Sequence, residues 1–224
     1  MGYYIDLELI SIDWYREKLK SGYLPPSRMI LKERTDERLE YFKSINLKNL
    51  KELHQTLKKK DQLLELSKAD CLSEEYLNML LREINGILPK PNKIKEFFGI
   101  LRETVLKLEK IGIQNTQKLY DKVLTKALRK ELSETTGISK EEILKLTKLT
   151  DLSRIKWVGV NYARALYDIG VDTVEKISKA DPLDLYERVN AFMNEKNIFK
   201  GKIGLNDIRI LIECANEVPQ EIEY

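Results

Sequence analysis

Apolar residues recur at intervals of three and four positions along almost the whole chain. Leu-Leu-Glu-Leu at 63–66 and Ile-Leu-Lys-Leu at 143–146 are examples, whereas alternating β-branched residues are almost absent. Intervals of three and four place apolar side chains on one face of an α-helix, while strands require a period of two. The pattern therefore predicts an all-α protein.

Three segments share one arrangement of apolar positions: FKSINLKNLKEL (42–53), LEKIGIQNTQKL (108–119) and LYDIGVDTVEKI (166–177). Each has, at the same position, a residue type that tolerates the left-handed backbone ending a helix: Asn46, Gly112 and Gly170. Three positions later, each has a residue suited to cap the start of a helix: Asn49, Asn115 and Thr173. Each segment therefore predicts a helix, a tight turn and a second helix.

The pattern also predicts helices outside these segments. Ser139 followed by Glu142 forms a capping sequence, and Asp181-Pro182 suits the entry to a helix. A final helix is expected from about Asn206. Near the N-terminus, a helix capped by Ser11 is expected to bury Trp14 in the core.

Two prolines in ILPKPNK (87–93) cannot lie inside a helix and mark a boundary. We therefore predict tandem repeats in two helical lobes. The N-terminal lobe, residues 1–88, contains a degenerate first repeat. The C-terminal lobe, residues 89–224, contains two units, at about 89–150 and 151–216, followed by an acidic tail. The tail sequence NEVPQEIEY is expected to be loose.

Each repeat is preceded by a sequence similar to the helix-hairpin-helix motif. The motif consists of an apolar residue, any residue, Gly, an apolar residue, Gly, three residues of any type, Ala, two residues of any type and an apolar residue. Such a hairpin offers backbone N–H groups and a helix N-terminus to phosphate oxygens. The third copy has Trp157 at the first glycine position and keeps Gly159. The second copy keeps Gly99 and has Leu101 at the second position, while the first copy, around residues 31–35, has neither glycine.

The chain resembles a helix-hairpin-helix-related family of bacteria and archaea known as domain of unknown function 4332. The residues that carry the resemblance include GYYIDL, YLPPSRMILKE, PKPNK, LEKIGI, LTKLTDLSRIKWV and GVDTVEKISKADPLDLYE. The resemblance extends over nearly the full length. It implies nucleic-acid binding through the hairpins and no established biochemical activity.

The formal net charge is +3, but the charge is unevenly distributed. Residues 88–130 carry 11 basic and 4 acidic side chains, a surplus that attracts polyanions. Because Gly99 lies in this segment, we predict that the second hairpin contributes most to nucleic-acid binding and that the third assists. The predicted binding residues are Lys93, Lys95, Gly99, Arg102, Lys107, Lys110, Lys156, Gly159 and Arg164.

The same features have a second interpretation, in which the hairpins only pack helices together and Trp157 is a buried anchor. The chain would then be a scaffold for a protein partner or for self-association. DNA is the predicted partner, and RNA is also compatible because a phosphate clamp does not distinguish the sugars well. The sequence leaves the oligomeric state open.

Little in the sequence indicates catalysis or a cofactor. His54 is the only histidine, and it is expected at the surface or half-buried, so a histidine metal site or a catalytic triad is not expected. FKGKIGLND (199–207) lacks the glycine spacing of a nucleotide-binding loop. Cys71 and Cys214 are far apart and are expected to be buried or inert thiols. We therefore expect a non-enzymatic cytoplasmic protein without membrane segment, leader, metal or cofactor.

Overall fold

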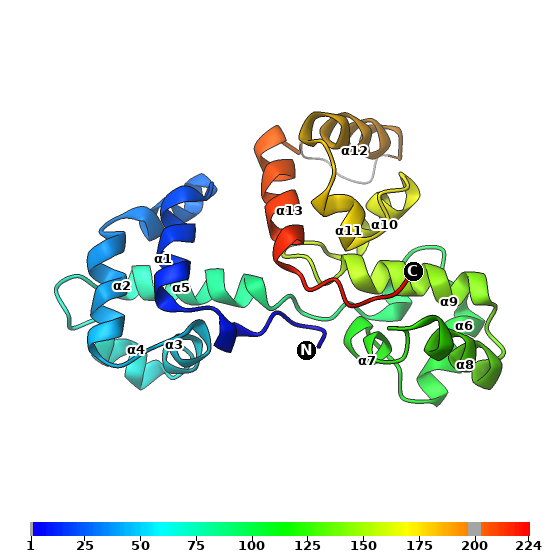
Figure 1. The fold of residues 1–224 in the computed structure, drawn as a ribbon, viewed down its shortest axis with the longest axis horizontal. Helices are drawn as coiled ribbons and strands as arrows, with labels where there is room; N and C mark the ends of the chain where they lie inside the picture. Colours follow the sequence, from blue (N-terminus) through cyan, green and yellow to red (C-terminus); the bar gives the residue numbers. More distant parts are fainter. Residues whose placement is uncertain (1, 197–202) are drawn as a thin grey trace. The chain divides into compact units, whose positions relative to one another are not determined.

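The computed structural model describes residues 2–196 and 203–224, which form helices and loops (Figure 1). Within these residues, β-structure is limited to isolated bridges between Ser11 and Asn49 and between Lys93 and Asn115. The all-α prediction is confirmed. Among the same residues, no helix combines the length and the apolar character that crossing a lipid bilayer requires.

The chain divides into two compact units. One comprises Asp6–Leu88, and the other comprises Pro89–Tyr224 together with the described residues up to Ile5. The first few residues therefore fold with the C-terminal unit. Tyr3 shows why, because its hydroxyl is within 2.8 Å of the Thr116 hydroxyl.

The N-terminal unit is built from short helices around a leucine-rich core. Its helices are η1 (Leu7–Leu9), α1 (Ile12–Ser21), η2 (Pro26–Lys32), α2 (Thr35–Ser44), α3 (Leu50–Leu57), α4 (Lys60–Leu66) and α5 (Glu74–Ile87). As predicted, Ser11 caps α1 by accepting a hydrogen bond from the Trp14 N–H. The prediction that Trp14 is buried is wrong, because this residue is 49% exposed. Ile12, Tyr15 and Leu19, at intervals of three and four, form the buried face of α1 instead.

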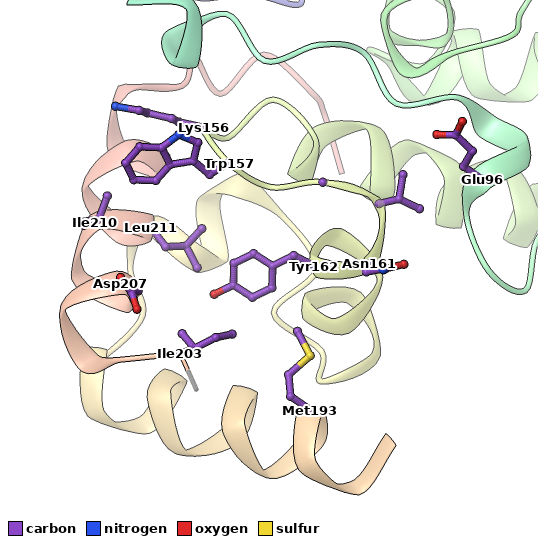
Figure 2. A pocket seen from close by; sticks show the side chains of 12 residues that line it. Glu96, Lys156, Trp157, Asn161, Tyr162, Met193, Ile203, Asp207, Ile210 and Leu211 are labelled. Atoms are coloured by element: carbon purple, nitrogen blue, oxygen red, sulfur yellow. The ribbon is translucent and has the colours of Figure 1, made fainter. Parts of the chain in front are cut away.

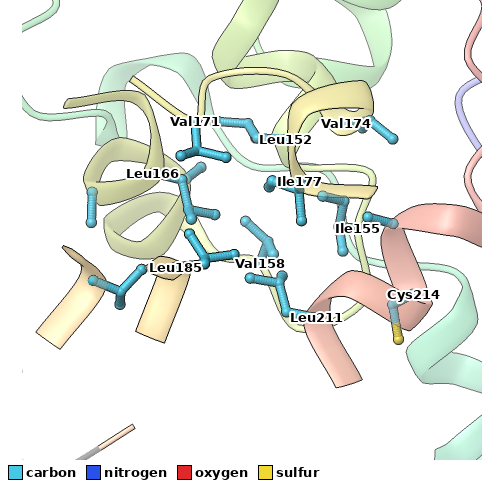
Figure 3. Close-up of a cluster of buried hydrophobic side chains, with 14 of the residues drawn as sticks. Leu152, Ile155, Val158, Leu166, Val171, Val174, Ile177, Leu185, Leu211 and Cys214 are labelled. Carbon is cyan, nitrogen blue, oxygen red and sulfur yellow. The ribbon is translucent and has the colours of Figure 1, made fainter. Parts of the chain in front are cut away.

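The C-terminal unit contains two separate hydrophobic clusters. Its helices are η3 (Ile94–Glu96), α6 (Arg102–Lys110), α7 (Thr116–Tyr120), α8 (Lys126–Thr136), α9 (Lys140–Leu152), α10 (Val160–Asp168), α11 (Val174–Ser178), α12 (Pro182–Lys196) and α13 (Leu205–Glu217). One cluster lies among η3 and α6–α9 and includes Leu108 and Ile143. The other, shown in Figure 3, joins α10–α13 and includes Leu166 and Leu211. Ile100 packs against both clusters, so the second hairpin lies where they meet.

The three predicted turns have the expected backbone geometry. Asn46, Gly112 and Gly170 all have positive φ, at 64°, 80° and 76°. The next residue in each turn donates its N–H back to a carbonyl in the last turn of the preceding helix: Leu47 to Phe42, Ile113 to Leu108 and Val171 to Leu166. Side chains cap the following helices as predicted: Asn49 on α3, Asn115 on α7 and Thr173 on α11.

A second contact recurs at the start of α3, α7 and α11. The first residues of these helices donate backbone N–H groups to an oxygen in a preceding segment: Leu50 to the Ile10 carbonyl, Thr116 to the Asn92 carbonyl and Val174 to the Asp151 carboxylate. In the third case a buried side chain therefore replaces a backbone carbonyl. The local arrangement is kept although the chemistry of the acceptor differs.

The predicted loose C-terminal tail is instead held against the C-terminal unit. The Glu223 N–H donates to the Leu124 carbonyl, and the Tyr224 hydroxyl donates to Asp151. The buried guanidinium groups of Arg129 and Arg154 donate to tail carbonyls, those of Glu223 and Pro219. Because a buried guanidinium requires acceptors, the tail completes the hydrogen bonding of the core. Its acidic composition did not reveal this role.

Candidate nucleic-acid interface

The second hairpin, residues 97–101, connects η3 to α6 in the C-terminal unit. Phe97 is buried and anchors it, whereas Phe98 and Leu101 are 82% and 66% exposed. Among the described residues, no protein acceptor receives the N–H groups of Gly99 and Leu101. Helix α6 begins at the next residue with no side-chain cap. The hairpin therefore presents open backbone donors beside the positive end of a helix.

Two cations from outside the hairpin hold its carbonyl oxygens. The Arg164 guanidinium, from α10, donates to the Phe98 carbonyl, and the Lys145 ammonium, from α9, donates to the Gly99 carbonyl at 2.7 Å. In a trans peptide the C=O and the N–H point in opposite directions. The Phe98 carbonyl faces Arg164, so the Gly99 N–H in the same peptide faces away from it. This contact orients the donor outward.

Two features favour glycine at position 99. Its φ of +75° lies in the left-handed region, which other residues adopt at a cost. A Cβ atom would also lie 2.7 Å from Nη1 of Arg164. Arg164 is itself held by Asp168, whose two carboxylate oxygens accept from its Nε at 2.9 and 2.8 Å. The predicted binding residue Arg164 is thus already engaged within the protein.

The third hairpin, residues 155–159, has the same left-handed backbone at the same motif position. Here the residue is Trp157, with a φ of +66°. Trp157 is 44% exposed, and the Lys156 ammonium lies 4.4 Å from the centre of an indole ring. The Gly159 N–H donates to the Trp157 carbonyl at 3.2 Å, so this amide is occupied. A Cβ on Gly159 would meet open space, and its φ is −83°.

The first hairpin, residues 31–35, differs from the other two. Its left-handed residue is Arg34, one motif position later, and α2 begins directly after it. The Arg34 guanidinium bonds Glu37 at 2.6 Å and Asp70 at 3.3 Å. This hairpin therefore combines a shifted backbone with a cation that is already paired.

The predicted cations fall into two groups. Some have acidic partners in the protein: Lys93 with Glu96 at 3.6 Å and Lys107 with Glu103 at 2.7 Å. Within the part of the chain that the structure describes, the exposed side chains without an ion-pair partner include Lys95, Arg102 and Lys110. Arg102 is the first residue of α6, and Lys95 lies in η3, just before the hairpin.

Lys145 is a residue that sequence reasoning missed. It lies in α9, 46 positions after Gly99, and no motif in the sequence links the two. Its ammonium is also 3.7 Å from the Glu142 carboxylate. Only the tertiary structure brings this cation to the hairpin.

The residues considered for metal or redox chemistry lie in structural positions. His54 was expected at the surface or half-buried, but it belongs to the buried face of α3, where its Nε2 is 2.8 Å from Asn85. Cys71 and Cys214 are buried and are not joined in a disulfide. In residues 2–196 and 203–224, no group of His, Cys, Asp or Glu is arranged to hold a metal ion. Part of FKGKIGLND, residues 199–202, lies outside the described residues.

Comparison with known proteins identifies the family of this chain. Residues 98–218, more than half of the chain, match the family described as Domain of unknown function (DUF4332). The chain belongs to the DUF4332 family. The matched DUF4332 region begins in the second hairpin and includes the whole of the third. No curated protein and no solved structure matches the chain.

Proposed function

We propose that this DUF4332 protein binds DNA without catalysis and without sequence preference, mainly through the second hairpin. The observation that carries the proposal is the pair of open N–H groups at Gly99 and Leu101, next to the uncapped start of α6. Backbone N–H groups at a helix start bind phosphate oxygens without reading base identity. RNA presents the same phosphates and falls within the proposal.

The charges around the hairpin suit weak, salt-sensitive binding. Lys95 and Arg102 flank the hairpin and have no ion-pair partner among the described residues, whereas Lys93, Lys107 and Arg164 are already paired. Each cation that neutralises a phosphate releases a counterion, so affinity falls as salt rises. Contacts with two or three phosphates correspond to a log–log slope of about −2 to −3.

In this proposal the chain consists of tandem helix-hairpin-helix-like repeats in two lobes. One is Asp6–Leu88, in place of the predicted 1–88, and the other is Pro89–Tyr224 with the described residues up to Ile5. The recurring left-handed turns at Asn46, Gly112 and Gly170 support it. So do the recurring N–H contacts at the starts of α3, α7 and α11. Because the Gly159 N–H is already hydrogen-bonded within the protein, we assign the third hairpin only a secondary part in phosphate binding.

The test is a salt titration of binding to a mixed-sequence duplex, measured by fluorescence anisotropy. The double variant Lys95→Glu/Arg102→Glu is expected to abolish measurable binding at low salt while leaving helicity unchanged. A matched control, Lys59→Glu/Lys60→Glu, makes the same charge change at exposed positions of the N-terminal unit. No duplex binding at low salt, or equal loss in both variants, would rule out the second hairpin as the binding site.

A protein-interaction scaffold is the second candidate, favoured by the exposed apolar side chains of Phe98 and Leu101. Contiguous exposed apolar groups mark interaction sites more often than single ones do. Phe98→Ser distinguishes the two functions. It should change DNA binding through backbone amides by less than about twofold, whereas it removes the exposed apolar ring that a protein partner would contact. Concentration-dependent self-association that disappears in Phe98→Ser, without DNA binding, would favour the scaffold.

A further inference from the structure

A cavity of about 670 Å³ lies beside the third hairpin. Residues of α10, α12 and α13 line it, as Figure 2 shows. Cavities that bind small molecules and single chemical groups have volumes of roughly 300–1,000 Å³ and mostly apolar walls. Met193, Ile210 and Leu211 give this cavity such walls, while Asn161 and Asp207 add polar groups.

Trp157 lines one end of the cavity in an unfavourable backbone conformation. A left-handed conformation costs a non-glycine residue roughly 1–2 kcal/mol, and its presence is a reason to look for function. The residue is 44% exposed, so part of it can be reached from solvent. The indole ring offers a flat surface for stacking.

Tyr162 projects from α10 toward α13 in Figure 2. Its hydroxyl has no hydrogen-bond partner among the described residues. Burial raises its pKa, and the nearby Asp207 carboxylate raises it further, so the hydroxyl keeps its proton and remains a donor. Asp207 Oδ2 accepts from the Gly204 N–H at 2.8 Å, which fixes the carboxylate in place. The cavity therefore contains an unused donor close to a positioned acceptor.

The end of the third hairpin opens onto the same cavity. Gly159 and the first residues of α10 line it, and α10 begins with no side-chain cap. The positive end of α10 favours an anionic group at this edge. The Glu96 carboxylate also lines the cavity and has the Lys93 ammonium as a partner at 3.6 Å. An uncapped helix start thus adjoins an aromatic, mainly apolar cavity.

We propose that the cavity receives one unstacked base of single-stranded DNA, whose adjacent phosphate lies at the start of α10. The proposal deepens the DNA-binding function above and rests on it. Trp157 stacks on the base, the Tyr162 hydroxyl donates to a ring nitrogen or carbonyl, and the Asp207 carboxylate accepts from an exocyclic amino group. An apolar side chain of a protein partner would exclude water from the Tyr162 hydroxyl and the Asp207 carboxylate without hydrogen-bonding to either, at a cost of about 1–3 kcal/mol for each polar group left unpaired.

The experiment compares three probes of one mixed sequence: a ten-nucleotide single strand, the same strand with abasic sites, and the matched duplex. The protein carries Trp14→Phe, because Trp14 is the only other tryptophan. Binding is followed by anisotropy of the labelled probe and by Trp157 fluorescence. The single strand should bind about five- to 100-fold more tightly than the abasic strand and should quench Trp157, as expected for base stacking on an aromatic side chain.

Two variants test the role of the cavity. Trp157→Gly removes the ring at a position whose backbone suits glycine, and Tyr162→Phe removes only the hydroxyl. Each should reduce the preference for the single strand over the abasic strand, and Trp157→Gly should reduce it to about onefold. Duplex affinity depends mainly on the second hairpin and should fall less than single-strand affinity does. In contrast, Lys95→Glu/Arg102→Glu should weaken all three probes together, which separates failure of the second hairpin from failure of the cavity.

Equal affinity for normal and abasic strands in the Trp14→Phe protein would overturn the proposal. So would a Trp157→Gly variant that keeps its preference for the single strand. Quenching of Trp157 by an apolar peptide, with none by the single strand, would assign the cavity to a protein partner instead. Circular dichroism of each variant checks that the helices are intact.

Discussion

The second and third hairpins use the same left-handed backbone at the same motif position, but with opposite residue types. At Gly99 the missing side chain leaves space that the Arg164 guanidinium occupies. At Trp157 the largest side chain of all takes that conformation and remains 44% exposed. The comparison shows that the same left-handed backbone can orient an N–H donor outward at Gly99 and expose an aromatic ring at Trp157.

The two hairpins are also physically coupled. Arg164 belongs to α10, the helix that follows the third hairpin, and its guanidinium holds the second hairpin. A change in one hairpin can therefore alter the other. The variants below separate their contributions.

The largest effect is expected for Gly99→Val, which forces a β-branched residue into the left-handed region and displaces Arg164. We expect the free energy of unfolding to fall by about 2 kcal/mol or more, measured by chemical denaturation. Gly159→Ala is the matched control, because its backbone is extended and a Cβ meets open space. Equal destabilisation by the two substitutions would contradict the steric role assigned to Gly99.

Arg164→Gln should have the next largest effect. It removes a charged donor from the Phe98 carbonyl and an ion pair with Asp168, and we expect a loss of about 1 kcal/mol in the free energy of unfolding. Duplex affinity should fall severalfold, because the Gly99 peptide is no longer held. Lys179→Gln, which removes an exposed ion pair with Glu175, is the control. If both variants bind duplex like the parent, Arg164 does not position the hairpin.

Asp172→Asn tests a contact that distinguishes the third repeat, since the corresponding residue in the second repeat is Gln114. The Asp172 carboxylate joins α9 to α11 through Lys148 at 2.5 Å and Lys176 at 2.7 Å. Burial alone would raise its pKa, but the two ammonium groups outweigh burial and lower the pKa below its ordinary value. We expect the substitution to cost roughly 0.5–1 kcal/mol near neutral pH.

The pH dependence of this effect follows from the direction of the shift. A lowered pKa in the folded state means that the stabilisation is fully present above the unfolded pKa of about 3.9 and is lost as pH falls through the folded value. Unfolding curves of the parent and Asp172→Asn should therefore converge under more acidic conditions. A difference in stability that persists well below that pH would contradict an electrostatic role.

Trp157→Gly should change the free energy of unfolding least, by less than about 0.5 kcal/mol. Relief of the left-handed strain offsets the lost ring contacts and the greater freedom of glycine in the unfolded chain. Thermal and chemical unfolding would measure it. A loss as large as that in Gly99→Val would mean that the indole ring is part of the core, as in the alternative sequence interpretation.

Local features of the fold were predictable from sequence because neighbouring residues decide them. Helix periodicity, the left-handed turns at Asn46, Gly112 and Gly170, and the caps at Asn49, Asn115 and Thr173 all depend on residues within a few positions. Family membership was also recognisable from LEKIGI, LTKLTDLSRIKWV and GVDTVEKISKADPLDLYE, which lie within the matched residues 98–218. GYYIDL, YLPPSRMILKE and PKPNK lie before them, so the match covers less of the chain than the expected near-full length.

Only the tertiary structure decided which groups at the candidate site are available. Arg164 and Lys145 bind hairpin carbonyls 66 and 46 positions away, and the tail supplies acceptors for Arg129 and Arg154. The net charge of a segment does not determine whether its cations are exposed or already paired. Likewise, a Trp residue at a glycine position of the motif does not determine the direction of its indole ring. These properties depend on partners that are distant in sequence, so they are settled only when the chain packs.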